Sequence, residues 1–547
     1  MADWVRGYRR GLLRGDVLAG LTVWASIVPE SVAYAEIAGV PPQNAFYAAP
    51  IALAGYALLG GSRFLIVGAT SAAAVLSAST VKGVSSDPGA VVGLSAALAV
   101  IVGAVLVAAG AARLGFLTNF LAEPALVGFL FGMALTIMVR QTGKILGVSS
   151  GEGDFFERLA KLLSQAGDWS WTTITVGVAA VASLLLERLL PRLPASLIVL
   201  AVGLILSQAL NLHAHGVQTV GRIPAAVPVP DLPGITSADW AELAGGSLGV
   251  ALVVFAESYS IASRFARLHG NEVKADREMG AVNLAVGFFR GFAVSGSASR
   301  SAAAEGAGGR SPMVSLVAAA LVLFTGAFLT SLFTPLPEAV LGAIVIVAVK
   351  GFLRVGEIRR YATHDRPSLW VALTALIGVL VFDLLPGLML AVLMSLLLFI
   401  AYSSTPRVAV LGLLTGTGVW GDLQEHPRAV AAPGILVARP DGALFFGNVH
   451  RVRTAVKDLV AASDRPPRAV VVDLTASYRL GLPVLDTLAD LAADLDHQGV
   501  ELHVARIRAG PTRSLSRHPL HATLNPDRLH ATLTDAVNAL SDGWGTS

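Results

Sequence analysis

The feature that most constrains this chain is a series of long stretches that contain no Asp, Glu, Lys or Arg. Examples are residues 38–62, 88–112, 169–186, 311–337 and 384–406. A helix needs about 20 apolar residues to cross roughly 30 Å of hydrocarbon, and most of these runs reach that length. Because 54% of the residues are hydrophobic and only 14% are charged, we predict a polytopic α-helical membrane protein that lies in contact with lipid.

The apolar pattern predicts 14 transmembrane segments, several of them short or interrupted by Gly or Pro. They are expected near residues 17–37, 45–60, 64–81, 90–112, 116–139, 170–190, 195–211, 246–264, 277–292, 297–310, 313–333, 337–353, 367–384 and 386–403. Hydropathy alone supports about ten to twelve of these segments, because the others carry charges or are too short.

The distribution of Lys and Arg predicts a cytoplasmic N-terminus. Residues 1–16 contain four arginines and lack the apolar region of a removable signal peptide. With this orientation, the basic segments 264–277 and 350–366 also face the cytoplasm. The loop 140–168, which contains Lys144, is an exception. An even number of spans returns the C-terminus to the cytoplasm, and we expect the membrane to be a bacterial inner membrane.

The composition changes after residue 404, where charged residues become frequent and apolar runs shorten. Short strand-like runs alternate with two amphipathic helical patterns, which is typical of a small α/β domain. We therefore divide the chain into a cytoplasmic N-terminus (1–16), a transmembrane transport domain (17–404), a linker (405–432) and a small cytoplasmic α/β domain (433–547).

The membrane region contains an internal repeat. The sequence PESVAYA at 29–35 matches AESYSIA at 256–262, which places Glu30 and Glu257 at equivalent positions 227 residues apart. The two motifs lie in the first and the eighth predicted segments, an offset of seven. Because seven is odd, we expect the copies, at about 17–211 and 246–403, to have opposite orientations in the membrane.

Inverted repeats of this kind predict a binding site at mid-membrane. Two broken helices then point their N-termini toward each other, and their free N–H groups and dipoles favour an anion. The small polar stretches that begin at Gly68 and Ser295 have suitable composition, and Glu30 and Glu257 would flank the site. A buried carboxylate must become neutral or find a partner, so a purely structural role for either glutamate is the alternative.

Several classes of function are not supported by the sequence. There is no cysteine, which excludes disulfides, thiolate metal sites and thiol catalysis. The sequence has no ATP-binding loop motif and no His pattern typical of a metal site. The net charge is only +3 and the basic residues flank predicted spans, which gives no indication of nucleic-acid binding. We expect neither an enzyme nor a cofactor or metal.

Long stretches of the sequence resemble one family. The segments DVLAGLTVWASIVPESVAYAEIAGVPP (16–42), GGSRFLIVGATSAA (60–73) and FLAEPALVGF (120–129), with the blocks at 254–319 and 336–351, are similar to the SulP family of anion transporters. The C-terminal region is similar to STAS domains. The resemblance implies 14 segments in two inverted sevens, with a core domain (segments 1–4 and 8–11) that moves against a gate domain (5–7 and 12–14). We also expect a homodimer.

The resemblance also implies the residues of the anion site, which in this family lies between the third and tenth segments. Carried onto this sequence, it indicates Glu30, Tyr34, Gly68, Ala69, Thr70, Glu257, Ser299 and Arg300. The sequence leaves open whether Arg300 binds the anion or pairs with a glutamate. One departure concerns the STAS domain, where Gly481, Leu482 and Pro483 replace the acidic and hydroxyl residues that usually surround a phosphorylation site.

These features together predict secondary active transport of a small anion by alternating access, coupled to protons through Glu257 or Glu30. Sulfate, bicarbonate, chloride and small dicarboxylates remain open as substrates. Sodium-coupled bicarbonate uptake is an alternative, because Glu257 and nearby hydroxyls could hold a sodium ion. An anion channel, or a sensor that signals through the STAS domain, is a further alternative.

Overall fold

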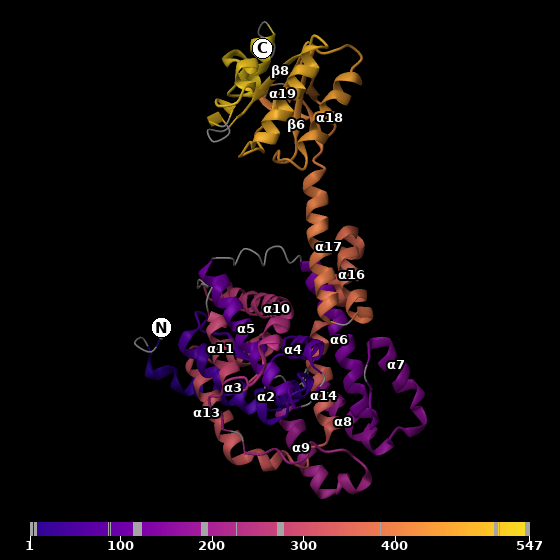
Figure 1. Ribbon diagram of the computed structural model, residues 1–547. Helices are drawn as coiled ribbons and strands as arrows, with labels where there is room; N and C mark the ends of the chain where they lie inside the picture. Colours follow the sequence, from indigo (N-terminus) through magenta and orange to yellow (C-terminus); the bar gives the residue numbers. More distant parts are fainter. Residues whose placement is uncertain are drawn as a thin grey trace. The chain divides into compact units, whose positions relative to one another are not determined.

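The computed structural model of this protein divides into two compact units, Met1–Ser395 and Leu396–Ser547 (Figure 1). It describes residues 4, 8–112 except 86 and 88, 123–186 except 152, 195–270 except 226, and 278–541 except 383, 415, 508–511 and 514. We describe the two units separately.

The first unit is helical. Its α-helices are α2 (Leu13–Ile37), α3 (Gln43–Leu59), α4 (Ser71–Val84), α5 (Val91–Ala111), α6 (Glu123–Leu146), α7 (Phe155–Ser164), α8 (Trp171–Leu186), α9 (Ala195–Ala209), α10 (Ser237–His269), α11 (Glu278–Phe288), α12 (Ala298–Gly306), α13 (Met313–Phe324), α14 (Glu338–Val349), α15 (Val355–His364), α16 (Arg366–Phe382) and α17 (Leu384–Ser404), which continues into the second unit. A helix lies within each of the 14 segments predicted from the sequence.

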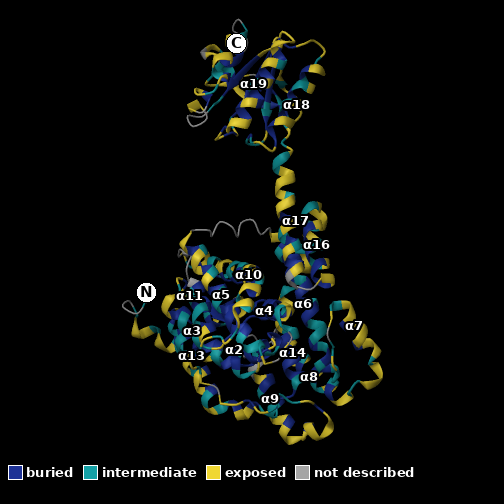
Figure 2. Ribbon diagram, viewed as in Figure 1, coloured by how far each residue is buried: buried dark blue, intermediate teal, exposed yellow. Residues whose placement is uncertain are grey.

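Seven described helical stretches are long and apolar enough to cross a membrane by length and composition. They are Arg10–Ile37, Val91–Ala111, Glu123–Leu146, Ser237–His269, Met313–Phe333, Glu338–His364 and Pro386–Ser404. Figure 2 shows exposed stretches along helices of the first unit. Large hydrophobic residues are among the exposed ones, including Trp171, Phe328 and Trp370. Such apolar surface is expected where helices face lipid, because lipid does not penalise its exposure.

The helices of the first unit pack as two bundles. The core bundle contains α2, α3, α4, α5, α10, α11, α12 and α13, and the gate bundle contains α6, α8, α9, α14 and α16. In Figure 1, α3, α11 and α13 lie together, as do α6, α8 and α14. This grouping agrees with the core and gate segments that the family resemblance implies. The packing between the bundles involves mainly α2, which contacts α14 and α9.

Glycines allow close approach within each bundle. A Cβ atom on Gly103 of α5 would lie 2.5 Å from the backbone nitrogen of Leu284 in α11. A Cβ atom on Gly128 of α6 would lie 1.9 Å from the carbonyl oxygen of Ala372 in α16. Neither position accepts a side chain without separating the helices, which explains part of the high glycine content.

Two helices, α4 and α12, are each preceded by a short strand, and the two strands pair with each other. Strand β1 (Ile66–Gly68) precedes α4, and β2 (Ser295–Ser297) precedes α12. The strands are antiparallel, with Val67 opposite Gly296. The pairing brings the N-termini of α4 and α12 close together although they are more than 200 residues apart in sequence.

Several predicted spans have different bounds in the structure, and the fifth span shows the physical reason. The sequence places it at 116–139, whereas α6 runs from Glu123 to Leu146, and residues 113–122 lie outside the described part of the chain. The prediction ended the span before Arg140 because charged residues normally lie in loops. In the structure α6 continues past Lys144, whose charge is compensated by two carboxylates from other helices.

The second unit contains an α/β sheet flanked by helices. Its strands are β3 (Val408–Leu414), β4 (Val419–Asp422), β5 (Ala429–Val430), β6 (Ile435–Pro440), β7 (Ala469–Asp473), β8 (Glu501–Ala505) and β9 (Leu529–His530), and its α-helices include α18 (Val449–Ala461), α19 (Leu482–Asp496), α21 (Leu520–Leu524) and α22 (Leu533–Leu540). The order in the sheet is β4-β3-β6-β7-β8-β9, and β6 to β9 are parallel.

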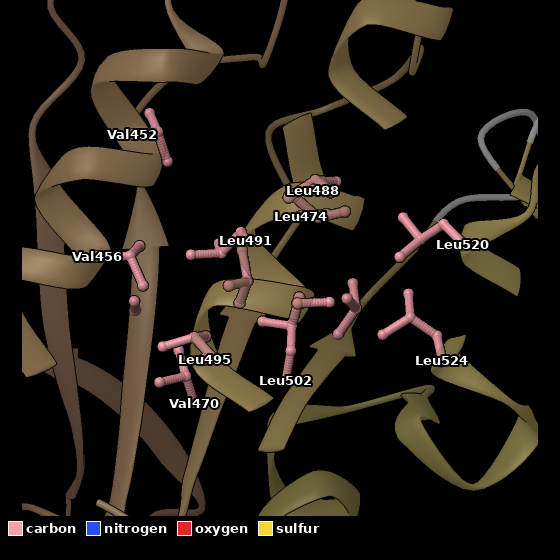
Figure 3. Packing of buried hydrophobic residues seen from close by; sticks show 14 of the residues in the cluster. Val452, Val456, Val470, Leu474, Leu488, Leu491, Leu495, Leu502, Leu520 and Leu524 are labelled. Carbon is pink, nitrogen blue, oxygen red and sulfur yellow. The ribbon is translucent and has the colours of Figure 1, made fainter. Parts of the chain in front are cut away.

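Helices α18 and α19 cover one face of this sheet. Their valine and leucine side chains form a buried cluster with residues of the strands (Figure 3). In α18 the buried residues Val449, Val452, Val456 and Val460 recur at intervals of three and four, as the helical period requires. The amphipathic pattern therefore correctly predicted which face of this helix is buried.

The segment 405–432, which the sequence assigns to a linker, contributes three strands. Strand β3 pairs with β4, β5 and β6, so the sheet begins at Val408. Conversely, the apolar run at 434–448 forms a strand only at β6. Phe445 and Asn448 beyond it instead form a turn that is closed by the Asn448 side chain, which accepts a hydrogen bond from the Phe445 N–H.

Candidate functional site

Two helix N-termini converge beside the paired strands β1 and β2. Thr70 caps α4, since its hydroxyl accepts a 3.4 Å hydrogen bond from the N–H of Ala73. Ser297 caps α12 in the same way, by accepting from the N–H of Arg300 at 3.4 Å. The first turns of two helices thus direct their dipoles and free N–H groups toward one region, and both features favour a negative charge there.

Arg300 supplies a positive charge at this place. Its side chain is only 1% exposed, and its Nη2 donates to the carbonyl oxygen of Ala69 at 2.6 Å. Within the described part of the chain, Nε and Nη1 are buried and have no hydrogen-bond partner. Nη1 lies 3.7 Å from Oε2 of Glu30. A buried guanidinium with unsatisfied donors is costly, and an anion could satisfy them.

Glu257 connects α10 to both paired segments. Its Oε2 accepts a 2.7 Å hydrogen bond from the Ser295 hydroxyl and a 3.3 Å hydrogen bond from the Thr70 hydroxyl. Thr70 therefore caps α4 and also contacts the glutamate. This arrangement holds the carboxylate between the two half-helices, close to the region where their N-termini converge.

Glu30 and Tyr34 approach the same region from α2. Tyr34 is buried, its hydroxyl is hydrogen-bonded to Ser71, and it lies in the electrostatic field of Glu30, Arg300 and Glu257. Glu30 follows Pro29, which lies inside α2. Proline has no backbone N–H, so the carbonyl one turn earlier in α2 lacks its usual helical hydrogen bond. This carbonyl lies about one turn of the helix from Glu30.

Gly68 and Ala69 shape the backbone next to Arg300. A Cβ atom on Gly68 would lie 3.0 Å from the Cδ1 of Ile27 and 3.4 Å from the Nη1 of Arg300. A larger residue there would displace the guanidinium. Ala69 is fully buried, and its carbonyl oxygen holds Arg300 in place.

Ser299 lies at the edge of this arrangement. It is exposed on the first turn of α12, and its hydroxyl is 3.2 Å from that of Ser297. The structure thus joins the other seven predicted residues through direct or electrostatic contacts and places Ser299 beside them.

The sequence did not indicate the residues that support the site. Asn283 of α11 is fully buried and bonds both the N–H and the carbonyl of Val294, which leads into β2. Ser301 accepts a 2.9 Å hydrogen bond from the N–H of Ile66 at the start of β1. The only sequence feature that could have indicated Asn283 is its position among apolar residues in a predicted span. A polar amide in such a place usually has a specific hydrogen-bond partner.

The fold is that of a helical transporter with a C-terminal STAS domain. The murine solute carrier 26 member A9 anion transporter, solved in an inward-facing state, has the same fold, with a TM-score of 0.90 at 21% identity over 98% of this chain and 93% of that chain. The transmembrane domain of the cyanobacterial bicarbonate transporter BicA gives 0.62 at 19% identity over 70% of this chain and 98% of that one.

The chain belongs to the sulfate permease (SulP) family, which matches residues 13–375, and the STAS domain family matches residues 426–536. A Mycobacterium tuberculosis protein named as a probable sulfate transporter is 35% identical over 98% of this chain and 96% of its own length. Sulfate transporter 1.3 of Arabidopsis thaliana is 27% identical over 98% and 86%. The family resemblance noted in the sequence is confirmed, and the relatives are named transporters rather than enzymes.

Proposed function

We propose that this protein carries a small anion across the membrane by secondary active transport, in which the core bundle moves against the gate bundle. The observation that carries the proposal is Arg300. Its buried guanidinium has two nitrogen atoms without a hydrogen-bond partner in the described residues, and it lies at the N-terminus of α12. An oxyanion bound there would accept from the arginine and from backbone N–H groups.

Sulfate is the first candidate substrate, because the two relatives described above, which match nearly the whole chain, are named sulfate transporters. A tetrahedral dianion has several acceptor oxygens, which suits a site that presents a guanidinium and two helix N-termini. Bicarbonate is the second candidate, supported by the structural similarity to a bicarbonate transporter. Small dicarboxylates and chloride are compatible with the same chemistry.

Proton coupling is proposed through Glu257, with a smaller contribution from Glu30. An anion beside an ionised carboxylate is repelled, so anion binding and protonation of the carboxylate favour each other. Glu257 is bonded to two hydroxyl groups that are able to donate or to accept. The hydroxyls can therefore adapt to either protonation state of the glutamate.

Sodium coupling is the second candidate, and the same oxygen atoms support it. Thr70, Ser295 and Glu257 bring two hydroxyls and a carboxylate together, which are oxygen ligands suited to a hard cation. An anion channel or a sensor that acts through the STAS domain would use the same anion site without coupling.

An uptake experiment distinguishes these functions. The purified protein is placed in liposomes, and uptake of radiolabelled sulfate, bicarbonate and succinate is measured with an imposed pH gradient, an imposed sodium gradient or neither. We expect sulfate to accumulate when the internal pH is higher than the external pH. Accumulation that requires sodium instead supports the sodium-coupled alternative. Binding without accumulation indicates a sensor, and a current that follows only the anion gradient indicates a channel.

We further propose that residues 17–404 form the transport domain and that the STAS domain is regulatory. The protein is expected to form a homodimer in a bacterial inner membrane with both termini in the cytoplasm. Removal of residues 406–547 deletes the whole sheet from β3 onward. We expect this truncation to reduce turnover or stability and to leave the anion preference unchanged, because the proposed site contains no residue beyond Arg300. A changed preference in the uptake panel would contradict a purely regulatory role.

A further inference from the structure

Lys144 forms a second charged cluster, away from the candidate anion site. Its Nζ is paired with Oε1 of Glu36 and lies 3.8 Å from Oε2 of Glu338. The three side chains are 18%, 37% and 29% exposed, respectively. Lys144 is near the end of α6, Glu36 is near the end of α2, and Glu338 begins α14.

The two carboxylates belong to different bundles. Glu338 is in the gate bundle together with Lys144, whereas Glu36 is in the core bundle. Within the gate bundle α6 and α14 approach closely, since a Cβ atom on Gly342 would lie 3.4 Å from the Cβ of Lys144. The Lys144 side chain is therefore anchored to the gate bundle, and its ammonium group reaches across to α2, the core helix with the main contacts to the gate.

The cluster lies at the opposite end of α2 from a separate core contact. Asp16, in the first turn of α2, accepts hydrogen bonds from the N–H of Arg310 at 2.8 Å and the hydroxyl of Ser311 at 2.6 Å, both of which follow α12. That contact stays within the core bundle. At the other end of α2, by contrast, the ion pair between Glu36 and Lys144 connects the core bundle to the gate bundle.

Partial burial gives this ion pair more weight than an exposed one. Exposed pairs contribute little because water screens them, but an effective dielectric lower than that of water strengthens the attraction. Loss of the ammonium group would leave two carboxylates facing each other at the boundary. The pair consequently favours any state in which the two bundles touch at this end of α2.

We propose that Lys144 is a positioning residue that holds the core and gate bundles together at the membrane face where α2 ends, and that its pairing with Glu36 must break when the anion site opens toward that face. This inference rests on the proposed movement of the core bundle against the gate bundle. In this proposal Lys144 does not contact the substrate. It influences the face of the membrane toward which the anion site is open.

The absence of cysteine in the chain makes a direct test possible. The reporter is Ala298→Cys, a single cysteine at an exposed position on the first turn of α12. Membrane-impermeant maleimide is added to either face of sealed vesicles of known orientation, and the labelling rate is measured. In Lys144→Met, which keeps an unbranched apolar stem, we expect the rate from the face where α2 ends to rise about fivefold or more, the lower end of typical coupling between states.

Matched variants separate the bridge from general damage. Glu36→Gln should reproduce the effect of Lys144→Met, and the double variant should show no further increase, because each change breaks the same pair. Lys144→Arg should retain the original rate. Glu338→Gln is the control, because it removes the contact within the gate bundle and leaves the bridge to the core intact. Its labelling rate should stay close to that of the reporter alone.

Two results would overturn the inference: labelling from that face that is unchanged in both Lys144→Met and Glu36→Gln, or an increase in Glu338→Gln as large as theirs. Sulfate binding to the same variants is measured in detergent, where membrane sidedness plays no part. If the protein without the reporter cysteine neither binds nor transports any anion, the proposed function fails, whereas the labelling comparison still decides the role of the bridge.

Discussion

The two sequence-matched halves of the core bundle contribute differently to the candidate site. The second half supplies Glu257 and Arg300, whereas the first half supplies Glu30, Tyr34 and Thr70. The halves are joined by Arg300, which donates to the carbonyl oxygen of Ala69, and by Ser301, which accepts from the N–H of Ile66. Ser258 accepts a 2.9 Å hydrogen bond from the N–H of Gly296. Its counterpart Ser31 has a buried hydroxyl without a partner among the described residues. Matched positions of a repeated scaffold can therefore differ in their hydrogen bonds and in the charge that they bring to the site.

The matched glutamates provide the strongest test of this asymmetry. Glu257→Gln mimics the protonated carboxyl, so the variant should still exchange sulfate across the membrane but lose accumulation driven by a pH gradient. Glu30→Gln should reduce accumulation less, since Glu257 has the contacts to both half-helices. Uptake and exchange assays in liposomes measure both effects. If both variants accumulate sulfate normally, neither glutamate carries the proton.

Arg300 has no charged counterpart in the first half, where the equivalent position is Ala73. Arg300→Ala should weaken sulfate binding by about 2 kcal/mol or more, which is roughly 30-fold, because a buried charge pair with the anion is lost. Arg300→Lys keeps the charge but not the planar donor geometry, and should recover part of the affinity. Equilibrium binding to purified protein is the measurement. Unchanged affinity in a folded Arg300→Ala variant would show that the helix N-termini suffice.

The matched serines give a smaller and more local comparison. Ser258→Ala leaves the buried N–H of Gly296 without its acceptor, which should destabilise the protein by about 1–3 kcal/mol. Ser31→Ala removes a hydroxyl that has no partner in the described chain, and should be neutral or slightly stabilising. Thermal unfolding in detergent compares the two variants. Equal shifts would show that the halves are more alike than their hydrogen bonds indicate.

The smallest expected effect concerns the stability of the STAS domain, which belongs to neither half of the core bundle. His503 and His530 are stacked, with Nδ1 of His503 3.0 Å from Nε2 of His530. Burial lowers the pKa of both side chains. Protons therefore bind the unfolded domain more readily, and stability that is present above about pH 6.5 is lost as the pH falls below that value. The protection of β8 amides against hydrogen exchange in the full-length protein, relative to the intrinsic exchange rate at each pH, should decrease between pH 7 and 5.5. It should decrease less in His503→Gln.

The sequence predicted those features that depend on composition or on a local pattern. The apolar runs located the helices, and the two matched motifs located Glu30 and Glu257. The segment 405–432 was assigned to a linker because β4 and β5 are short, and because the apolar run of β3 begins only a few residues after a span and does not stand out from it. The strand structure of β3 depends on pairing with β6, which a local pattern does not contain.

Contacts across long sequence distances explain the remaining differences. Lys144 was interpreted as an interfacial residue of a loop, since the sequence does not indicate that Glu36 and Glu338 lie beside it. Likewise, Ser299 and Arg300 are adjacent in the chain, but the helical turn exposes one and buries the other. Side-chain direction at the first turn of a half-helix depends on the bounds of that helix, which are the least certain part of a sequence-based prediction.

The location of Arg300, Glu30 and Glu257 within one bundle has an electrical consequence. If the core bundle moves as a body, these fixed charges move with the substrate, and their sum is minus one when both glutamates are ionised and zero when one is protonated. Each elementary charge moved across the membrane responds to voltage by about 2.3 kcal/mol per 100 mV. The return step of the empty carrier should therefore depend on membrane potential, and this dependence should disappear when Glu257 is replaced by Gln.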